Sequence, residues 1–345
     1  MPTSQGDPIA VVGEWIATDL QEVSHDPASL DLGGRWAVSI TFEGTATLAR
    51  FGTWARRAPS PDEMGPWRGP DPDAWTSSLV EDAYVAAVES VRAHISRGEV
   101  YQANICRVLR TSLEPDSDVV ALHNLLVAGN PAPHSGALRL PDHGVHIASA
   151  SPELYLRRDG DTIQSRPIKG TGKRAADLLA KDEAENVMIV DLVRNDLGRI
   201  CRAGSVAVPG MLEVEHHPGL VHLVSTVSGQ LLPLTTWPQI LAATFPPGSV
   251  TGAPKIAALE IIDALEAGPR GPYCGAFGWV DADRGTAELA VAIRTFWRED
   301  SPSGPQLAFG TGAGITWDSD PQAEWRETQL KSARLLDVAG SGEVP

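Results

Sequence analysis

Three pairs of alternating segments, each pair joined by a short turn, constrain the fold of this chain more than any other feature. The pairs are ALRLPDHGVHIASAS (137–151, turning at Pro141–Gly144), ELYLRRDGDTIQSR (153–166, turning at Asp159–Asp161) and GAFGWVDADRGTAELAVAIRTF (275–296, turning near Asp283–Gly285). Alternating apolar residues on both sides of a Gly- or Asp-rich turn predict antiparallel hairpins. Parallel strands need long crossover connections instead, so the hairpins argue against a doubly wound parallel sheet.

Helical patterns lie between the hairpins. Residues 80–97 place apolar side chains at helical spacing, and Gly98 stands where such a helix would end. The patterns predict further helices over about 181–196, 253–266 and 320–337, whereas LAFGTGAGIT (307–316) predicts a strand broken by glycines. Hairpins interspersed with helices indicate an α+β fold with mainly antiparallel sheet.

The N-terminal region differs in pattern from the rest of the chain. Residues 1 to about 57 alternate weakly and predict a few strands, and residues 58–75 are rich in Pro, Gly and Asp, as a loop or linker would be. We therefore predict an N-terminal part, 1–75, and a larger part, 76–340, that form one interleaved unit.

Charge and cysteine usage exclude several classes of protein. The chain has 345 residues and a formal net charge of −16, which repels nucleic-acid backbones and anionic lipid. It has no signal-peptide pattern and no run of 18 apolar residues. Its three cysteines, Cys106, Cys201 and Cys274, show no CxxC spacing and predict reduced thiols. We expect a cytoplasmic protein without nucleic-acid or membrane partners, in which any anionic substrate is held by local cations or a metal.

The segment SRPIKGTGKR (165–174) offers a candidate nucleophile in Lys169, directly before Gly170. A nucleophilic lysine must lose a proton, which burial or neighbouring cations such as Arg166, Lys173 and Arg174 would favour. A hairpin would bring Glu153 close, and a carboxylic acid beside an amine can protonate a leaving hydroxyl. A basic turn and an ordinary glutamate at the end of a strand fit the same residues.

Acidic residues on two predicted helices form a candidate metal site. Glu185 stands in an otherwise apolar helical segment, and Glu324, Glu327 and Lys331 share one helical face. Carboxylates from two helices suit Mg²⁺. A solvated face with a Glu327–Lys331 pair is the alternative interpretation.

Other motifs are weaker signals. FPPGSVTGAPKIAAL (245–259) is a glycine-rich turn entering a helix, which favours an anion but lacks P-loop spacing. Arg294 offers a fork suited to a carboxylate. His222 has no CxxC pair beside it and no second His at HxxxH spacing, so we expect His222 to be a hydrogen-bonded histidine of the core.

Together and in order, blocks between about residues 96 and 336 resemble the chorismate-utilising enzymes, a family that includes anthranilate, aminodeoxychorismate, isochorismate and salicylate synthases. The blocks are GEVYQANICR, SPELYL, RPIKGT, AENVMIVDLVRNDLGR, HLVSTVSG, FPPGSVTGAPK, EIIDALE, PRGPYCGAFGW, AIRT, GTGAGIT and DSDPQAEWRET. The resemblance implies the anthranilate synthase component I-like fold, in which mainly antiparallel sheets form a sandwich flanked by helices.

The resemblance also implies roles for single residues. It places Glu185, Glu324 and Glu327 at Mg²⁺-binding positions, and Glu153 at the position of the acid that protonates the departing C4 hydroxyl. Positions that hold the substrate's carboxylates or line its pocket are Gln102, Gly170, Thr171, His222, Thr251, Lys255, Tyr273, Arg294, Gly312, Gly314 and Lys331.

Two positions distinguish among members of the family. Isochorismate and salicylate synthases carry a lysine base where this chain has Gln102, so the resemblance favours the ammonia-using members. Anthranilate synthases usually read PIAGT, whereas this chain reads PIKGT. The implied reaction is therefore the aminodeoxychorismate synthase component I type, in which Lys169 attacks C2 of chorismate as the C4 hydroxyl leaves, and ammonia then attacks C4 and displaces the lysine from C2. An anthranilate synthase large subunit and a non-catalytic chorismate-binding protein are the alternatives.

The resemblance carries expectations about partners and regulation. Ammonia would come from a separate glutaminase subunit or from solution, and the product would serve the synthesis of 4-aminobenzoate and folate. The short N-terminal region has no LLES-like segment, so we expect no feedback inhibition by tryptophan, and we expect no fused glutaminase or lyase domain.

Overall fold

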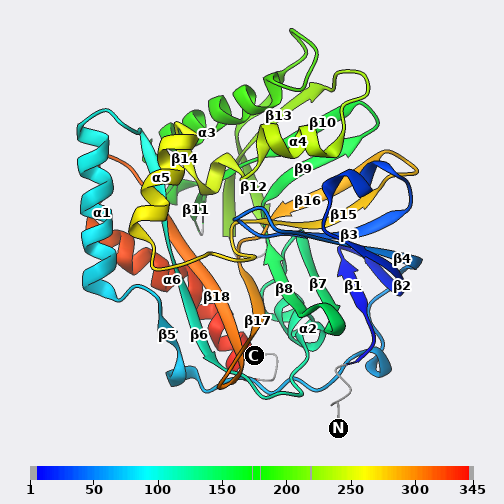
Figure 1. Cartoon of the computed structure of the whole chain (residues 1–345). Helices are drawn as coiled ribbons and strands as arrows, with labels where there is room; N and C mark the ends of the chain where they lie inside the picture. The colour runs from blue at the N-terminus through cyan, green and yellow to red at the C-terminus, as the bar shows by residue number, and fades with distance from the viewer. Residues whose placement is uncertain (1–5, 173, 179, 218–219, 342–345) are drawn as a thin grey trace.

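The computed structural model describes residues 6–172, 174–178, 180–217 and 220–341. Every strand pairing among these residues is antiparallel, which confirms the α+β architecture predicted from the hairpins (Figure 1). The turns form where glycine is needed: Gly144, Gly160 and Gly285 all have φ between +57° and +64°, a backbone region that glycine enters at little cost.

The strands follow one another in a single run of hydrogen-bonded pairs. In spatial order, the first half of the run is β12 (Ala207–His217), β13 (Leu220–Gln230), β10 (Thr162–Arg166), β9 (Leu154–Asp159), β16 (Thr286–Val291), β15 (Ala276–Asp281), β3 (Arg35–Ile40) and β4 (Ala46–Arg56), with β11 (Ile168–Gly172) also paired to β13.

The second half continues from β4. It consists of β2 (Trp15–Ser24), β1 (Ile9–Val12), β7 (His134–Leu140), β8 (Val145–Ser151), β17 (Thr295–Ser301), β18 (Gly304–Ile315) and β6 (Gln102–Ser112), and β6 also pairs with β5 (Thr76–Ser77) and β14 (Gly252–Ala253). Side chains from both halves, among them Trp36 of β3 and Ile147 of β8, share one buried core. The two halves of the run therefore pack face to face, as the two sheets of a sandwich do.

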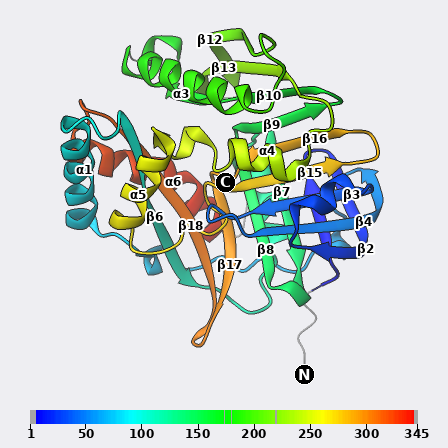
Figure 2. The ribbon, with the colours of Figure 1, turned by 45° about the horizontal axis from the view of Figure 1, so that its top comes forward.

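The described residues form six α-helices, which lie beside the strands (Figures 1 and 2). Four agree with the predicted ones: α1 (Glu81–Ser96), α3 (Ala180–Gly198), α5 (Lys255–Leu265) and α6 (Pro321–Ser341). Two further helices, α2 (Val119–Gly129) and α4 (Trp237–Thr244), were not predicted. The N-cap of α2 is Asp118, whose carboxylate accepts a bond from the Val120 amide at 3.0 Å, a start signal that was present in the sequence.

The prediction that glycines break the strand over 307–316 is wrong. β18 is continuous and pairs with β6 in an unbroken register from Gln306 to Ile315. The glycines have another purpose, since they leave room for side chains of the neighbouring elements, as described below.

The N-terminal strands are not a separate layer. β1 pairs with β7, and β3 pairs with β15, so residues from both sides of the predicted boundary at 75 share the same sheets. No helix among the described residues has the length and apolar character needed to cross a bilayer.

Candidate active site

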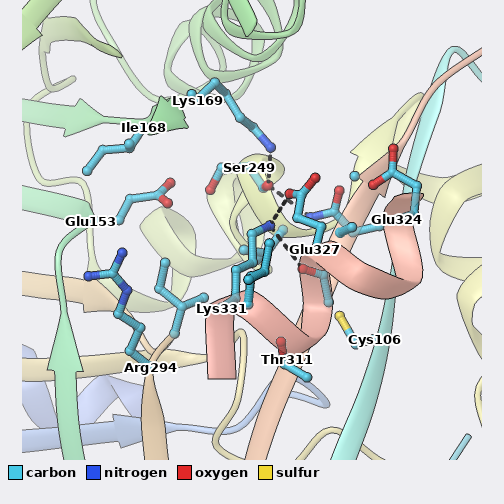
Figure 3. Close-up of a pocket in the computed structure, with 18 of the residues that line it drawn as sticks. Cys106, Glu153, Ile168, Lys169, Ser249, Arg294, Thr311, Glu324, Glu327 and Lys331 are labelled. Carbon is cyan, nitrogen blue, oxygen red and sulfur yellow. Dashed lines mark hydrogen bonds and ion pairs between the residues drawn. The ribbon is translucent and has the colours of Figure 1, made fainter. Parts of the chain in front are cut away.

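A cavity of about 780 Å³ opens between β11, α3, β18 and α6 (Figure 3). β18 and β6 form one wall, and α6 presents acidic and basic side chains from the other. Of the residues predicted for the site, the cavity is lined by Glu153, Lys169, Gly170, Glu185, His222, Tyr273, Arg294, Gly312, Gly314, Glu324, Glu327 and Lys331.

Lys169 extends from β11 into this cavity (Figure 3). Its Nζ lies 2.7 Å from Glu185 Oε1 and donates to the backbone carbonyl of Ser249 at 3.0 Å. Only 11% of the Lys169 side chain is exposed, so the amine is held inside the cavity by two acceptors.

Two of the three cations expected beside Lys169 are paired with other carboxylates. Arg166 pairs with Glu215, and Arg174 is largely exposed and lies 3.6 Å from Asp177. Lys173 lies outside the described residues. The expectation that these cations help to deprotonate Lys169 is therefore wrong for Arg166 and Arg174, because β-strand pairing and local turns direct both guanidinium groups to carboxylates of their own.

Glu153 is a buried acid, 4% exposed, just before β9. Burial raises the pKa of its carboxyl to about 7, although a hydrogen bond with Ser249 and the charge of Lys169 oppose the rise. Its Oε1 has no hydrogen-bond partner among the described residues. A carboxyl with this pKa is partly protonated at neutral pH, which suits a proton donor.

Arg294 supplies a cation to the same cavity, from the connection between β16 and β17. Its backbone has φ +52°, in the left-handed region that long side chains seldom adopt. Burial lowers the pKa of the guanidinium, and no side-chain partner for it is found in the described part of the chain. Figure 3 shows it pointing towards the space beside Glu153. Such a group is suited to bind an anion that enters the cavity.

The acidic side chains of α6 are held by neighbours. Glu324 accepts a bond from the Ser319 hydroxyl at 2.7 Å, and Glu327 forms an ion pair with Lys331 at 2.7 Å. Lys331 also donates to the carbonyl of Gly312 at 3.1 Å. The predicted sharing of one helical face is confirmed.

The three predicted metal ligands face one cavity but do not form a ready-made metal site. Within the described ranges, no group of three His, Cys, Asp or Glu side chains is arranged to hold a metal. Lysines stand where a metal ion would: Lys169 neutralises Glu185. The pKa of Lys331, whose side chain is half exposed, is raised by Glu327, Glu185 and Glu324 against a partial desolvation. The donor set, all carboxylates, fits a hard cation such as Mg²⁺.

Gly312 and Gly314 let other groups approach β18. A Cβ on Gly314 would lie 2.5 Å from Gln102 Nε2 and 2.6 Å from Glu185 Oε1, and a Cβ on Gly312 would lie 2.6 Å from Cys106 Sγ. Only glycine fits such contacts without displacing a neighbour, so these two positions shape the wall of the cavity.

Buried polar side chains complete the walls. His222 on β13 is 2% exposed. Tyr273 is 6% exposed, and burial raises the pKa of its hydroxyl well above the usual range. Its ring lies directly on Gly310, where an added Cβ would come within 2.0 Å.

Three of the remaining predicted residues, Gln102, Thr251 and Lys255, do not line the cavity. Gln102, fully buried, donates to Glu185 Oε1 at 2.7 Å and so orients that carboxylate. Thr251 bonds to the carbonyl of Pro247 at 3.2 Å. Lys255 points to Asp196, 2.7 Å away. The side chain of Thr171 lies outside the described part of the structure.

Sequence reasoning missed two residues that organise the site, although both lie in blocks it had singled out. The side-chain amide of Asn104 donates to the Ser249 carbonyl at 3.0 Å, and the same carbonyl accepts from Lys169. The signal for Ser249 was its place in the glycine-rich turn, where backbone groups are free to face a ligand.

A buried ion pair supports this arrangement from behind. Arg270, 1% exposed, binds both carboxylate oxygens of Glu266, at 2.9 and 2.6 Å. It also donates to the carbonyls of Val250 and Asn104, at 2.8 and 2.9 Å. One guanidinium thereby ties the glycine-rich turn to β6, which holds Asn104 and the Ser249 carbonyl in position.

All three cysteines are free and buried, in agreement with the prediction of reduced thiols. Cys106 and Cys274 line the cavity, and burial raises the pKa of the Cys106 thiol well above its usual value. A thiol that stays protonated is a poor nucleophile.

Known proteins resemble this chain in sequence. The chain is 38% identical to anthranilate synthase component 1 of Streptomyces coelicolor over 321 residues, which cover 88% of this chain and 61% of that protein. It is 39% identical to aminodeoxychorismate synthase component 1 of Escherichia coli over 274 residues, which cover 76% of this chain and 58% of that one. The chain thus spans less than two thirds of the length of either relative.

Solved structures share the fold. A putative isochorismate synthase, DhbC from Bacillus anthracis, superposes with a TM-score of 0.80 at 22% identity, covering 98% of this chain and 97% of that one. Anthranilate synthase component I from Streptococcus pneumoniae gives a TM-score of 0.76 at 24% identity, covering 95% and 90%. The family model described as chorismate binding enzyme matches residues 37–337. This chain therefore belongs to the chorismate binding enzyme family.

Proposed function

We propose that this protein is an aminodeoxychorismate synthase component I, which converts chorismate and ammonia to 4-amino-4-deoxychorismate and water. The observation that carries the proposal is the presence of Lys169 and Glu153 in the walls of one cavity. An amine that forms a bond and an acid that protonates a leaving hydroxyl are the two groups that a stepwise substitution requires.

In the first step, Lys169 Nζ forms a bond to C2 of chorismate while the C4–O bond breaks, and Glu153 gives its proton to the departing hydroxyl, which leaves as water. An ammonium has no free electron pair, so Nζ must first lose a proton. Glu185 Oε1, 2.7 Å away, lies within reach of that proton. In the second step, ammonia forms a bond to C4, Lys169 leaves C2, and its nitrogen regains a proton.

The cations of the cavity would hold the substrate's carboxylates. Arg294 is suited to this role because its guanidinium is largely desolvated and faces the cavity. A desolvated cation gains more from an incoming anion than an exposed one does. Lys331 is the second candidate, and the two together place positive charge in a cavity of an otherwise acidic protein.

Mg²⁺ is proposed as the cofactor, held by Glu185, Glu324 and Glu327. When bound, it would supply a positive charge that holds a carboxylate of the substrate. Ammonia is proposed to come from a separate glutaminase subunit, which the name "component 1" of the Escherichia coli relative suggests.

The competing proposal is an anthranilate synthase component I. The chain is 38% identical to the Streptomyces coelicolor anthranilate synthase component 1 and 39% identical to the Escherichia coli aminodeoxychorismate synthase component 1. Sequence identity therefore favours the two proposals equally. The presence of Lys169 where anthranilate synthases usually carry alanine favours the aminodeoxychorismate reaction.

Mass spectrometry of the products formed from chorismate, ammonium and Mg²⁺ by the purified protein tests the choice. We expect 4-amino-4-deoxychorismate, and anthranilate as the sole product would overturn the proposal. The Lys169→Ala variant should lose most of its turnover and still bind chorismate. Wild-type turnover in that variant would show that Lys169 is not the nucleophile.

A further inference from the structure

A second and much smaller cavity, of about 20 Å³, also has Glu153 in its wall. Its other polar lining residues are Tyr155, Ser165, Asp196, Thr244 and Ser249. A cavity of this size holds one water molecule, provided that two or more polar groups can bind it. Glu153 therefore stands between the large cavity and a site of the size and polarity that a water requires.

The carboxyl of Glu153 has an unused acceptor for such a water. Its Oε1 is buried and has no hydrogen-bond partner among the described residues. A buried oxygen without a hydrogen-bond partner carries a free-energy cost. A water in the small cavity would remove that cost.

Asp196 on α3 also lines the small cavity. It is 7% exposed, and its Oδ2 accepts from Lys255 Nζ at 2.7 Å. Burial raises the pKa of Asp196, whereas Lys255 and Arg199 act to lower it. Asp196 therefore accepts a proton more readily than a surface aspartate does, and its slight exposure keeps it in contact with solvent.

We propose that the small cavity binds one water, and that Glu153, this water and Asp196 form a proton path that reaches solvent without crossing the large cavity. The path rests on the proposed role of Glu153 as the acid. Glu153 carboxylate takes a proton from the water, the water takes one from the Asp196 carboxyl, and Asp196 takes one from solvent. Only O–H bonds form and break, so the acid can be recharged while chorismate occupies the large cavity.

The charged groups around the path are known. Glu153 faces Lys169, which favours its ionised form, and Glu185, which disfavours it. Asp196 faces Lys255 and Arg199. The hydroxyl of Tyr155 hydrogen-bonds to Thr244 at 2.6 Å and closes one side of the small cavity. The path thus joins two carboxyls, each of which has a lysine as a charged neighbour.

Two variants interrupt the path differently. Asp196→Asn keeps the shape and one oxygen for Lys255 but cannot pass on a proton, and Val193→Ile adds a methylene to the wall of the small cavity and displaces the water. Each should lower kcat for chorismate consumption about tenfold, a modest part of the effect of general acid catalysis. Each should also raise the solvent deuterium isotope effect on kcat, with KM for chorismate unchanged.

The matched control is Asp191→Asn, which removes a carboxylate from the same helix, where Asp191 pairs at the surface with Arg194 at 2.9 Å. It should behave as the wild type. A purely structural role for Asp196 would change the melting temperature or KM and leave the isotope effect unaltered, and that result overturns the proposal.

Two further readouts separate this proposal from the proposed function. The first is chorismate consumption, measured whatever product forms, with Glu153→Gln as the reference variant. Consumption at the wild-type rate in Glu153→Gln would contradict the role of Glu153 as the acid. An inactive Glu153→Gln together with an unaffected Asp196→Asn would contradict only the proton path. A high-resolution crystal structure of the wild-type protein should show a water between Glu153 and Asp196, absent from Val193→Ile. A wild-type cavity without that water overturns the proposal irrespective of activity.

Discussion

Lys169 and Glu185 form an ion pair of 2.7 Å inside the cavity, and this pair joins β11 to α3 at the centre of the site. The same carboxylate oxygen of Glu185 accepts from Gln102, whose side chain in turn lies against Gly314. The position of Lys169 therefore depends on a residue of β18 that carries no functional group at all.

Replacing Gly314 with alanine tests that dependence. The added Cβ would lie 2.6 Å from Glu185 Oε1 and 2.5 Å from Gln102 Nε2, closer than van der Waals contact allows, so Glu185 must move and Lys169 loses its partner. We expect kcat for chorismate consumption to fall, by about a hundredfold if the reacting atoms are displaced by about 1 Å.

Gly198→Ala is the matched control, because nothing lies within 4 Å of a Cβ at that position. It should leave kcat unchanged. Steady-state kinetics of both variants check the prediction, and equal activity in Gly314→Ala would mean that Glu185 does not position Lys169.

The sequence was informative where residue type and spacing determine the outcome. Hairpin patterns and turn glycines determined the antiparallel fold, and helical spacing determined that Glu324, Glu327 and Lys331 share a face. Side-chain direction was not accessible in this way. Lys255 follows a glycine-rich turn, as an anion-binding lysine would, yet it points to Asp196, because the ion pair depends on how α3 packs against that turn.

The same limit explains the other differences. Arg166 and Arg174 are near Lys169 in sequence, but strand pairing directs Arg166 to Glu215. The glycines of β18 were interpreted as breaks in the strand. Their actual role, leaving space for side chains of neighbouring elements, depends on contacts that the sequence does not reveal. What could not be predicted is what depends on contacts between distant segments.

The activity should depend on pH through Glu153. Burial raises the pKa of its carboxyl to about 7, and only the protonated form can give a proton to the leaving hydroxyl. We therefore expect kcat, measured at saturating ammonia, to be highest below pH 7 and to fall as the pH rises through that value. In Glu153→Gln, kcat should fall by about 10²–10⁴-fold, and the decrease of kcat with rising pH should disappear. An unchanged decrease in this variant would assign it to another group.

Stability should fall in acid through His123. It is buried, and burial lowers its pKa from 6.5 to about 4, so the unfolded chain binds a proton that the folded protein does not. The free energy of unfolding then decreases as the pH falls from 6.5 towards 4, by about 3 kcal/mol in total for this group. Above pH 6.5 the group has no effect.

Urea unfolding at several pH values measures this change. His123→Gln, which cannot titrate, should show a smaller loss between pH 6.5 and 4 than the wild type. His146, whose pKa burial also lowers to about 4, contributes to the loss that remains. Parallel pH curves for the two proteins would contradict the assignment to His123.

Glu266→Gln should destabilise the fold strongly. The substitution keeps the shape of the side chain but leaves Arg270 buried without its counter-charge, which costs about 3–5 kcal/mol in such pairs. The midpoint of chemical unfolding should shift to lower denaturant with the slope unchanged. Asp161→Asn, which removes the exposed partner of Arg202, should cost about 0–1 kcal/mol. Similar losses in both variants would show that burial of the Arg270 pair adds nothing.

Binding of Mg²⁺ should depend on Glu327. In the structure its charge is balanced by Lys331 at 2.7 Å, and Glu185 is balanced by Lys169, so a divalent cation has to compete with two ammonium groups for the carboxylates. Glu327→Gln removes one anionic donor, and a site built mainly from carboxylates loses affinity when its charge falls. We expect weaker Mg²⁺ binding by calorimetry and a higher Mg²⁺ concentration for half-maximal activity.

Asp337→Asn is the matched control, because Asp337 is an exposed acid on the same helix that does not line the cavity. This variant should match the wild type in both measurements, which separates loss of a ligand from a general change in the charge of α6. If Glu327→Gln also binds Mg²⁺ as the wild type does, the ion is held elsewhere, and the acidic face of α6 then serves to orient Lys331 towards the substrate.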